Sequence, residues 1–275
     1  MDQVQLATFQ AVIETGGFEA AARQLHVTPS AVSQRIKALE SSVGQVLVRR
    51  ARPCVATPAG EALVRFAGQV ALLEREALAQ ARDGTRVSIV VNADSLHTWF
   101  LPALAAVPGP SYELHTDDEH YTADLLRSGV AMAAVTAEHV AVQGCRLEPL
   151  GAMRYLPVGA ASLPGDLETA PMIVYNRKDR LQHRFLASMR RRADPPIHYV
   201  PAAAAFVDAI RLGLGWGMVP EQVALADIAA GRYRPIFPDE FLDVPLYWQY
   251  WKIESAVLGD LTAAVKAAAA ATLRG

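Results

Sequence analysis

Cysteine is scarce in this chain of 275 residues, which has only Cys54 and Cys145. Two cysteines cannot build a disulfide scaffold or a cysteine-rich zinc site, so we expect two unpaired side chains in a reducing compartment. No run of about 18 apolar residues is present, as a membrane-spanning helix would need. The start, MDQVQLATFQ, lacks the basic and apolar regions of a secretion signal. We therefore expect a cytoplasmic protein without a membrane partner.

Signatures of catalysis are also missing. The sequence has no Walker motif, no His-Glu-x-x-His and no Gly-x-Ser-x-Gly. The glycine-rich run GLGWG at 213–217 follows a helical pattern and precedes a strand, the reverse of the order in a dinucleotide-binding loop. Only four lysines occur, and none has a recognisable Schiff-base setting. We expect a protein that is not an enzyme and that has no cofactor and no metal.

The composition suits a folded protein of two or three units, with 52% hydrophobic and 20% charged residues. The net charge of -2 is unevenly distributed. Residues 1–60 hold six cations and four anions, which leaves that segment at +2 and the remainder at -4. A basic module on an acidic body is consistent with local contact to a nucleic acid.

The most specific pattern lies between residues 18 and 43. Apolar residues at helical spacing predict a first helix over 4–13 and a short one over 18–25. Thr28-Pro29 predicts the start of a third helix, which ends before Gly44. The tight connection at 26–28 makes the pair a helix-turn-helix, a DNA-reading motif.

One face of this third helix is apolar, with Val32, Ile36, Leu39 and Val43 expected to pack inward. The opposite face is polar and suits the major groove, where Gln34 could present its amide to adenine. Two short strands, around 46–48 and 54–56, carry arginines suited to phosphate or minor-groove contact. The alternatives are a solvated helix face and an ordinary basic hairpin. The predicted DNA-binding residues are Thr28, Pro29, Ser30, Ser33, Gln34, Arg35, Lys37, Arg49, Arg50 and Arg52.

A longer helix is predicted from Thr57-Pro58 to about residue 82. Its apolar residues alternate spacings of three and four, which is typical of a coiled-coil seam about two heptads long. The alternative is a helix in the core of a single domain. The predicted dimerisation residues are Leu63, Phe66, Val70, Leu73 and Ala77.

From residue 84 onward the sequence alternates strands and helices, which predicts an α/β sheet, largely parallel, in two halves around a cleft. Ligands bind beyond the carboxyl ends of such strands. Ser95, expected to begin a helix, and Thr136 could hold a carboxylate. Aspartates near the cleft could hold a cation, and Trp99 could cap it. The predicted effector-binding residues are Asp94, Ser95, Trp99, Thr136, Asn176 and Asp179, each with a structural alternative such as a cap, a turn or core packing.

The run AARQLHVTPSAVSQRIKALESSVGQVLVRR, followed by ATPAGEALVRFA, resembles the DNA-binding domain and linker helix of LysR-type transcriptional regulators. This resemblance implies an N-terminal all-α winged helix-turn-helix with a long linker helix and a C-terminal α/β two-subdomain effector domain like periplasmic binding proteins. The implied domains are 1–58, 59–83 and 84–275, the last divided into subdomain I (about 84–158 and 244–275) and subdomain II (about 159–243). It also implies homodimers or tetramers that bind imperfect palindromes of double-stranded DNA and contact RNA polymerase.

Later segments, NADSLHTW at 92–99, NRKDRLQ at 176–182, GLGWGMVP at 213–220 and LYWQYWK at 246–252, resemble the branch of that family that senses basic amino acids (the LysG/ArgP type). This implies that L-lysine or L-arginine is the effector and that an amino-acid exporter gene is the target. The alternatives are a LysR-type regulator with another effector and a cytoplasmic two-lobed solute-binding protein without DNA function.

Overall fold

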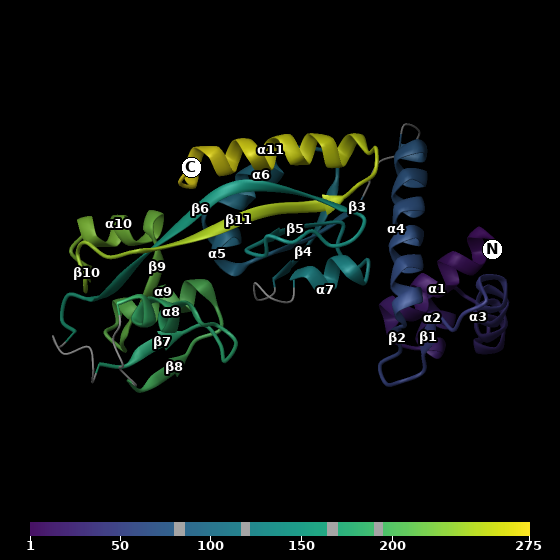
Figure 1. The fold of residues 1–275 in the computed structure, drawn as a ribbon, viewed down its shortest axis with the longest axis horizontal. Helices are drawn as coiled ribbons and strands as arrows, with labels where there is room; N and C mark the ends of the chain where they lie inside the picture. Colours follow the sequence, from purple (N-terminus) through teal and green to yellow (C-terminus); the bar gives the residue numbers. More distant parts are fainter. Residues whose placement is uncertain (80–85, 117–121, 164–169, 190–194) are drawn as a thin grey trace.

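The computed structural model describes residues 1–79, 86–116, 122–163, 170–189 and 195–275. A helical N-terminal domain and a larger α/β part lie on opposite sides of one long helix, α4 (Figure 1). None of the helices in these ranges combines the length and the apolar character needed to cross a bilayer.

Three helices form the N-terminal domain, and their ends follow the sequence signals. The predicted hydroxyl cap is confirmed, since Thr28 Oγ1 accepts a hydrogen bond from the Ala31 amide at 3.1 Å. Gly44 ends the third helix in the left-handed conformation at φ 75°. Val32, Ile36 and Leu39 are buried, but the predicted burial of Val43 is wrong, because it lies in the last turn and is 39% exposed. The helices are α1 Gln3–Thr15, α2 Phe18–Gln24 and α3 Pro29–Val43.

The basic segment after α3 forms a two-stranded antiparallel hairpin, shorter than predicted, of β1 Val48–Arg49 and β2 Val55–Ala56. Helix α4, Pro58–Ala79, follows it. Gly60 in its first turn lies so close to the Leu47 carbonyl oxygen that a Cβ would meet it at 2.2 Å. The glycine therefore lets the hairpin pack against the helix.

Helix α4 packs against both parts of the protein. Leu63 and Val64 join the N-terminal core, whereas Leu72 is fully buried in the core of the α/β part. Gly68 allows close approach of Trp251, whose ring would lie 2.7 Å from a Cβ at that position. The residues of the predicted coiled-coil seam therefore lie in different environments. Leu63 packs against the N-terminal core, whereas Phe66 and Leu73 are each 42% exposed. The side chain of Ala77 lies outside the described residues.

The α/β part holds one nine-stranded sheet in the order β4-β3-β5-β11-β6-β9-β7-β8, with β10 beside β6. The long strands β6 and β11 run side by side through both lobes (Figure 1). The strands are β3 Arg86–Val91, β4 Ser111–Thr116, β5 Ala133–Thr136, β6 Cys145–Ala160, β7 Met172–Val174, β8 Ile197–Tyr199, β9 Trp216–Pro220, β10 Tyr233–Pro235 and β11 Leu242–Trp251.

Helices cover this sheet, and α11 lies along β6 and β11 (Figure 1). The helix expected to begin at Ser95 begins earlier and has a wide turn in its middle, as α5 Ala93–Ser95, the π-helical η1 Leu96–Phe100 and α6 Leu101–Ala105. The other helices are α7 Thr122–Arg127, α8 Leu181–Ser188, α9 Ala203–Arg211, α10 Glu221–Ala229 and α11 Ala256–Thr272.

The prediction of a largely parallel sheet is only partly correct. Strands β3, β4 and β5 are parallel in one lobe, and β7, β8 and β9 in the other. The lobes are joined by antiparallel pairing of β11 with β5 and β6, and of β6 with β9. Strand β6 extends from residue 145 to 160, so the boundary proposed at 158 and 159 falls inside a continuous strand.

Candidate DNA-reading face and effector pocket

The outward face of α3 is accessible along its length. Gln34 and Lys37 are exposed, as are the cap residue and the first two residues of the helix, Thr28, Pro29 and Ser30. Ser33 is half-buried. The inward residues of the same helix are buried against α1 and α2, which fixes the direction of the polar face. The helix therefore presents small and polar side chains at its N-terminal end, the end that enters a groove in helix-turn-helix proteins.

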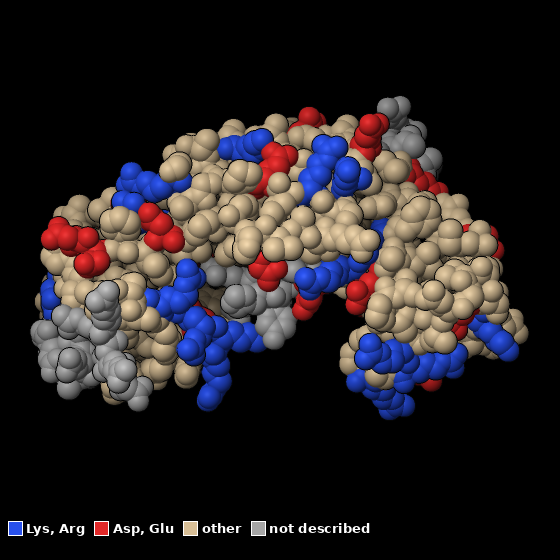
Figure 2. Space-filling view, viewed as in Figure 1, with Lys and Arg blue, Asp and Glu red and all other residues tan. Residues whose placement is uncertain are grey.

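Two of the basic residues predicted to contact DNA interact with other side chains of their own domain. The Arg35 guanidinium donates to Thr8 Oγ1 at 3.4 Å, and the Arg50 guanidinium lies 4.9 Å from the Phe18 ring centroid. Arg49 and Arg52 are exposed on the hairpin. Lys and Arg side chains gather at the end of the N-terminal domain where the hairpin lies (Figure 2). This grouping supplies the positive surface that phosphate contact needs.

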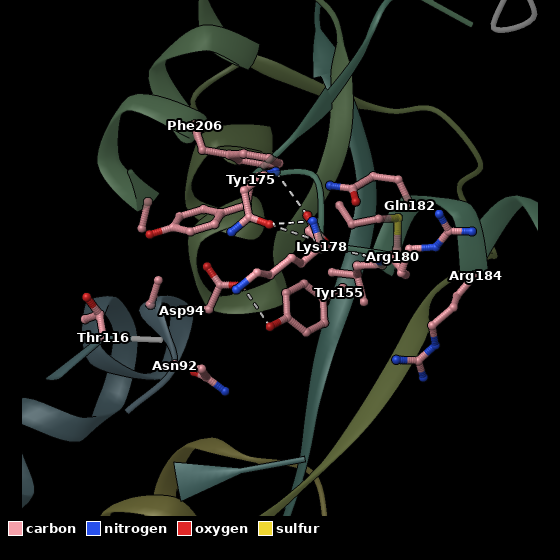
Figure 3. A pocket seen from close by; sticks show the side chains of 16 residues that line it. Asn92, Asp94, Thr116, Tyr155, Tyr175, Lys178, Arg180, Gln182, Arg184 and Phe206 are labelled. Carbon is pink, nitrogen blue, oxygen red and sulfur yellow. Dashed lines mark hydrogen bonds between the residues drawn. The ribbon is translucent and has the colours of Figure 1, made fainter. Parts of the chain in front are cut away.

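A pocket of about 200 Å³ opens between the two lobes of the α/β part. This volume is below the ~300–1,000 Å³ typical of drug-sized ligands and suits a smaller molecule. The first lobe contributes Asn92 and Asp94, and the second contributes the turn after β7 and the start of α8 (Figure 3). Its lining residues are Asn92, Ala93, Asp94, Thr116, Tyr155, Tyr175, Asn176, Lys178, Asp179, Arg180, Leu181, Gln182, Arg184, Ala203, Phe206 and Met218.

Asp94 is the most perturbed acid of this pocket. Loss of hydration raises its pKa to about 6, opposed by the Tyr155 hydroxyl, which donates to Asp94 Oδ2 at 2.9 Å. The negative charge of Asp179 raises the pKa further, and His97 lowers it. The two aspartates come from different lobes, so the pocket brings two carboxylates together where the lobes meet. A cationic group bound there would favour the ionised form of Asp94.

Asp179 also shapes the turn that it belongs to. Its two carboxylate oxygens accept hydrogen bonds from the Tyr175 amide at 3.0 Å and the Leu181 amide at 2.8 Å. Asn176 Oδ1 accepts from the Lys178 and Asp179 amides at 2.8 and 3.2 Å. Both residues therefore hold the loop between β7 and α8 in shape and line the pocket at the same time.

Three predicted effector contacts do not line this pocket. Trp99 is buried in the core, edge-on to Phe100 with ring centroids 5.6 Å apart. Thr136 is buried, and its hydroxyl accepts from the Glu138 amide at 3.0 Å. Ser95 does not begin the helix: Asn92 caps it, and Asn92 Oδ1 already accepts from the Ser95 amide at 2.7 Å.

The sequence interpretation missed several lining residues. Tyr155 lies in the long strand β6, and Met218 lies in β9, where no local pattern tells which side faces a cleft. Gln182 was not singled out, although it is the last residue of the quoted segment NRKDRLQ and lies three residues after Asp179. A polar residue one position inside a helix, after an Asx-type turn, was the signal that could have found it.

Comparison with known proteins agrees with this architecture. Residues 4–61 match the bacterial regulatory helix-turn-helix proteins of the lysR family, and residues 80–269 match the LysR substrate binding domain. The lysine export transcriptional regulatory protein LysG of Corynebacterium glutamicum is 42% identical over 294 residues, covering 100% of both chains.

Two solved structures are similar over the full length of the chain. ArgP from Mycobacterium tuberculosis has 47% identity and a TM-score of 0.90, covering 100% of this chain and 99% of that one. Full-length LysG from C. glutamicum with bound effector Arg has 40% identity and a TM-score of 0.84, covering 100% of both. The chain therefore belongs to the LysR family of helix-turn-helix regulatory proteins, and its α/β part is that family's substrate-binding domain.

Proposed function

We propose that this protein is a transcriptional regulator that binds double-stranded DNA in a sequence-specific manner and responds to a basic amino acid, L-lysine or L-arginine. The observation that carries the effector assignment is the pair of carboxylates, Asp94 and Asp179, that line one pocket from opposite lobes. An amino acid with a cationic side chain has two positive groups, and each meets an aspartate. A neutral amino acid would leave one of the two carboxylates without a cation.

The mouth of the pocket also carries positive charge. Lys178, Arg180 and Arg184 line the same pocket as exposed side chains. Their charge attracts the ligand carboxylate while the ligand approaches the pocket. The relative with bound effector Arg agrees with a basic amino acid as ligand, and the relative named for lysine export supports an exporter gene as the target.

The DNA-binding role rests on the exposed face of α3 and the basic hairpin. We assign base contact to Gln34 and phosphate or groove contact to Ser30, Ser33, Lys37 and the hairpin arginines. A homodimer or tetramer in the cytoplasm would place two such faces on the half-sites of an imperfect palindrome, with RNA polymerase as a further partner. The exposed residues of α4 support this assembly, as Phe66 and Leu73 leave an apolar stripe uncovered.

Calorimetry on the full chain tests the effector assignment. We expect lysine or arginine to bind and norleucine, which keeps the backbone but lacks the second cation, to bind at least ~10-fold more weakly, because one of the two pocket carboxylates then has no cationic partner. Equal affinity for norleucine would contradict a basic effector and would leave the DNA-binding role intact.

Selection of bound duplexes from a random pool tests the DNA assignment. Replacing Gln34 by Ala should relax the preference at one or two base pairs, which corresponds to a loss of ~1–3 kcal/mol of discrimination. Arg49→Ala is the matched control, since it should weaken binding evenly across sequences and reduce the salt dependence. Unchanged base preference in the Gln34 variant would show that another face of the domain reads the DNA.

A further inference from the structure

Two buried amide side chains in the pocket are each only half engaged. Gln182 is 1% exposed, and its Nε2 donates to the Ile173 carbonyl oxygen at 3.0 Å, but its Oε1 has no hydrogen-bond partner among the described residues. Asn92 is 6% exposed, and its Oδ1 accepts from the Ser95 amide, but its Nδ2 has no partner in the described part of the chain. A buried polar atom left without a partner costs ~1–3 kcal/mol, so such atoms require an explanation.

The orientation of both amides is fixed by their engaged atoms. Of the two ends of a side-chain amide only the amino group can donate to a carbonyl oxygen, so the Gln182 amino group must face Ile173 and its oxygen must face elsewhere. By the same reasoning the Asn92 oxygen must face the Ser95 amide. The pocket therefore offers one unused donor from the first lobe and one unused acceptor from the second.

On the first lobe, the unused donor of Asn92 lies two residues from the acceptor Asp94. A donor beside an acceptor matches the α-carboxylate and α-ammonium groups, which share one carbon atom. On the second lobe, Gln182 and Asp179 offer hydrogen-bond acceptors. These match an ammonium or guanidinium group, which only donates hydrogen bonds. The cations Lys178, Arg180 and Arg184 also line this side, but their side chains are exposed, where a high effective dielectric constant weakens their repulsion of a bound cation. Figure 3 shows Asn92 and Gln182 on opposite sides of the pocket, with Asp94 and Lys178 between them.

We propose that Gln182 is the residue that determines specificity for a cationic side chain, with its Oε1 accepting a hydrogen bond from the ligand's ammonium or guanidinium group. In this arrangement the α-carboxylate accepts from Asn92 and the α-ammonium pairs with Asp94. The ligand then spans both lobes, head group on the first and side chain on the second. This proposal deepens the proposed function and rests on it.

The orientation is tested by comparing lysine and arginine with norleucine, by calorimetry on the full chain and its variants. Gln182→Met removes the acceptor at similar size, and it should reduce the preference for the basic ligand over norleucine by ~10-fold or more, mainly by weakening the basic ligand. Gln182→Glu is the matched control, because it also loses the bond to Ile173 but keeps an acceptor oxygen. It should retain the preference.

Asp94→Asn supplies the second control. Since the α-ammonium is common to all three ligands, this change should weaken all of them by a similar factor and leave the preference unchanged. An unchanged preference in Gln182→Met, or a preference lost in Asp94→Asn instead, would overturn the orientation. Failure of the unmodified protein to bind lysine or arginine at all would overturn the proposed function, and this inference with it.

Discussion

At the scale of single residues, the position of a helix start affects which side chains reach the pocket. Asp94 follows a buried strand and lines the pocket. Ser95 and Trp99 do not line it, because Asn92, rather than Ser95, caps the helix, and Trp99 is buried in the core. On α3, where Thr28-Pro29 fixes the start, the inward and outward faces followed the sequence except in the last turn.

Asp94 should cost the protein stability at neutral pH. Its pKa in the fold is about 6, above the ordinary 3.8, so the folded state holds its proton more tightly. This loss of folding stability is absent at low pH, grows as the pH rises from 3.8 to about 6, and is complete above about pH 6. We expect Asp94→Asn, which can still accept from Tyr155, to stabilise the protein by ~1–2 kcal/mol at pH 8, after allowance for partial exposure, and by about half of this at pH 5.

Urea unfolding of both proteins at the two pH values measures this difference. Tyr155→Phe is a useful companion, because it removes the hydroxyl that stabilises the charged form and should destabilise the protein more at pH 8 than at pH 5. A stabilisation by Asp94→Asn that does not depend on pH would mean that burial does not penalise this carboxylate.

At the scale of helices and strands, short buried strands and capped helices were predictable, whereas the two longest strands were not. Strand β6 has 16 residues. Pro149, Gly151 and Pro157 interrupt its local pattern, and its partner β11 lies about 90 residues further along the chain, as in the pair Tyr155 and Leu242. Antiparallel pairing over such a separation depends on tertiary contacts that no local pattern contains.

The close packing of α4 on β11 leads to a prediction for Gly68. A Cβ at this position would lie 2.7 Å from the fully buried Trp251 ring, so Gly68→Ala forces one element to shift. Overpacking of this kind costs ~1–3 kcal/mol, only partly offset by the better helix propensity of alanine. We expect a lower free energy of unfolding in urea denaturation.

The matched control is Gly259→Ala in α11, where no atom of the described residues lies within 4 Å of the added Cβ. This variant should be ~0.5–1 kcal/mol more stable, because glycine inside a helix loses more conformational entropy. Equal stabilisation by both substitutions would show that α4 and β11 are not in tight contact in solution.

At the scale of the whole molecule, α4 has three surfaces with different partners. One packs on the N-terminal core, one on the α/β part, and the third leaves Phe66 and Leu73 exposed beside the start of α1. The spacing of apolar residues predicted the helix but could not tell which residues of the stripe the chain would cover itself. That division depends on the contact with Trp251, nearly 200 residues further along the sequence.

The exposed stripe predicts the assembly state. The double variant Phe66→Glu and Leu73→Glu should lower the mass measured by light scattering to that of a monomer, because charged residues opposed across a helix pair cannot be buried. The affinity of this double variant for a DNA duplex that contains both half-sites should fall at the same time. Leu225→Glu changes an exposed leucine on α10 and should alter neither quantity. Equal mass for the two variants would place the subunit contact elsewhere.

The pairing of β6 with β11 has a further consequence for how the protein responds to a ligand. Tyr155, whose hydroxyl donates to Asp94, is the register partner of Leu242 in β11, and β11 ends nine residues later at Trp251, against Gly68 of α4. At about 3.4 Å per residue this stretch spans some 30 Å. A rotation of this strand that is too small to open the pocket visibly produces a larger displacement at its far end, because displacement grows with distance along the strand. That far end packs against α4, the helix that carries the DNA-reading domain.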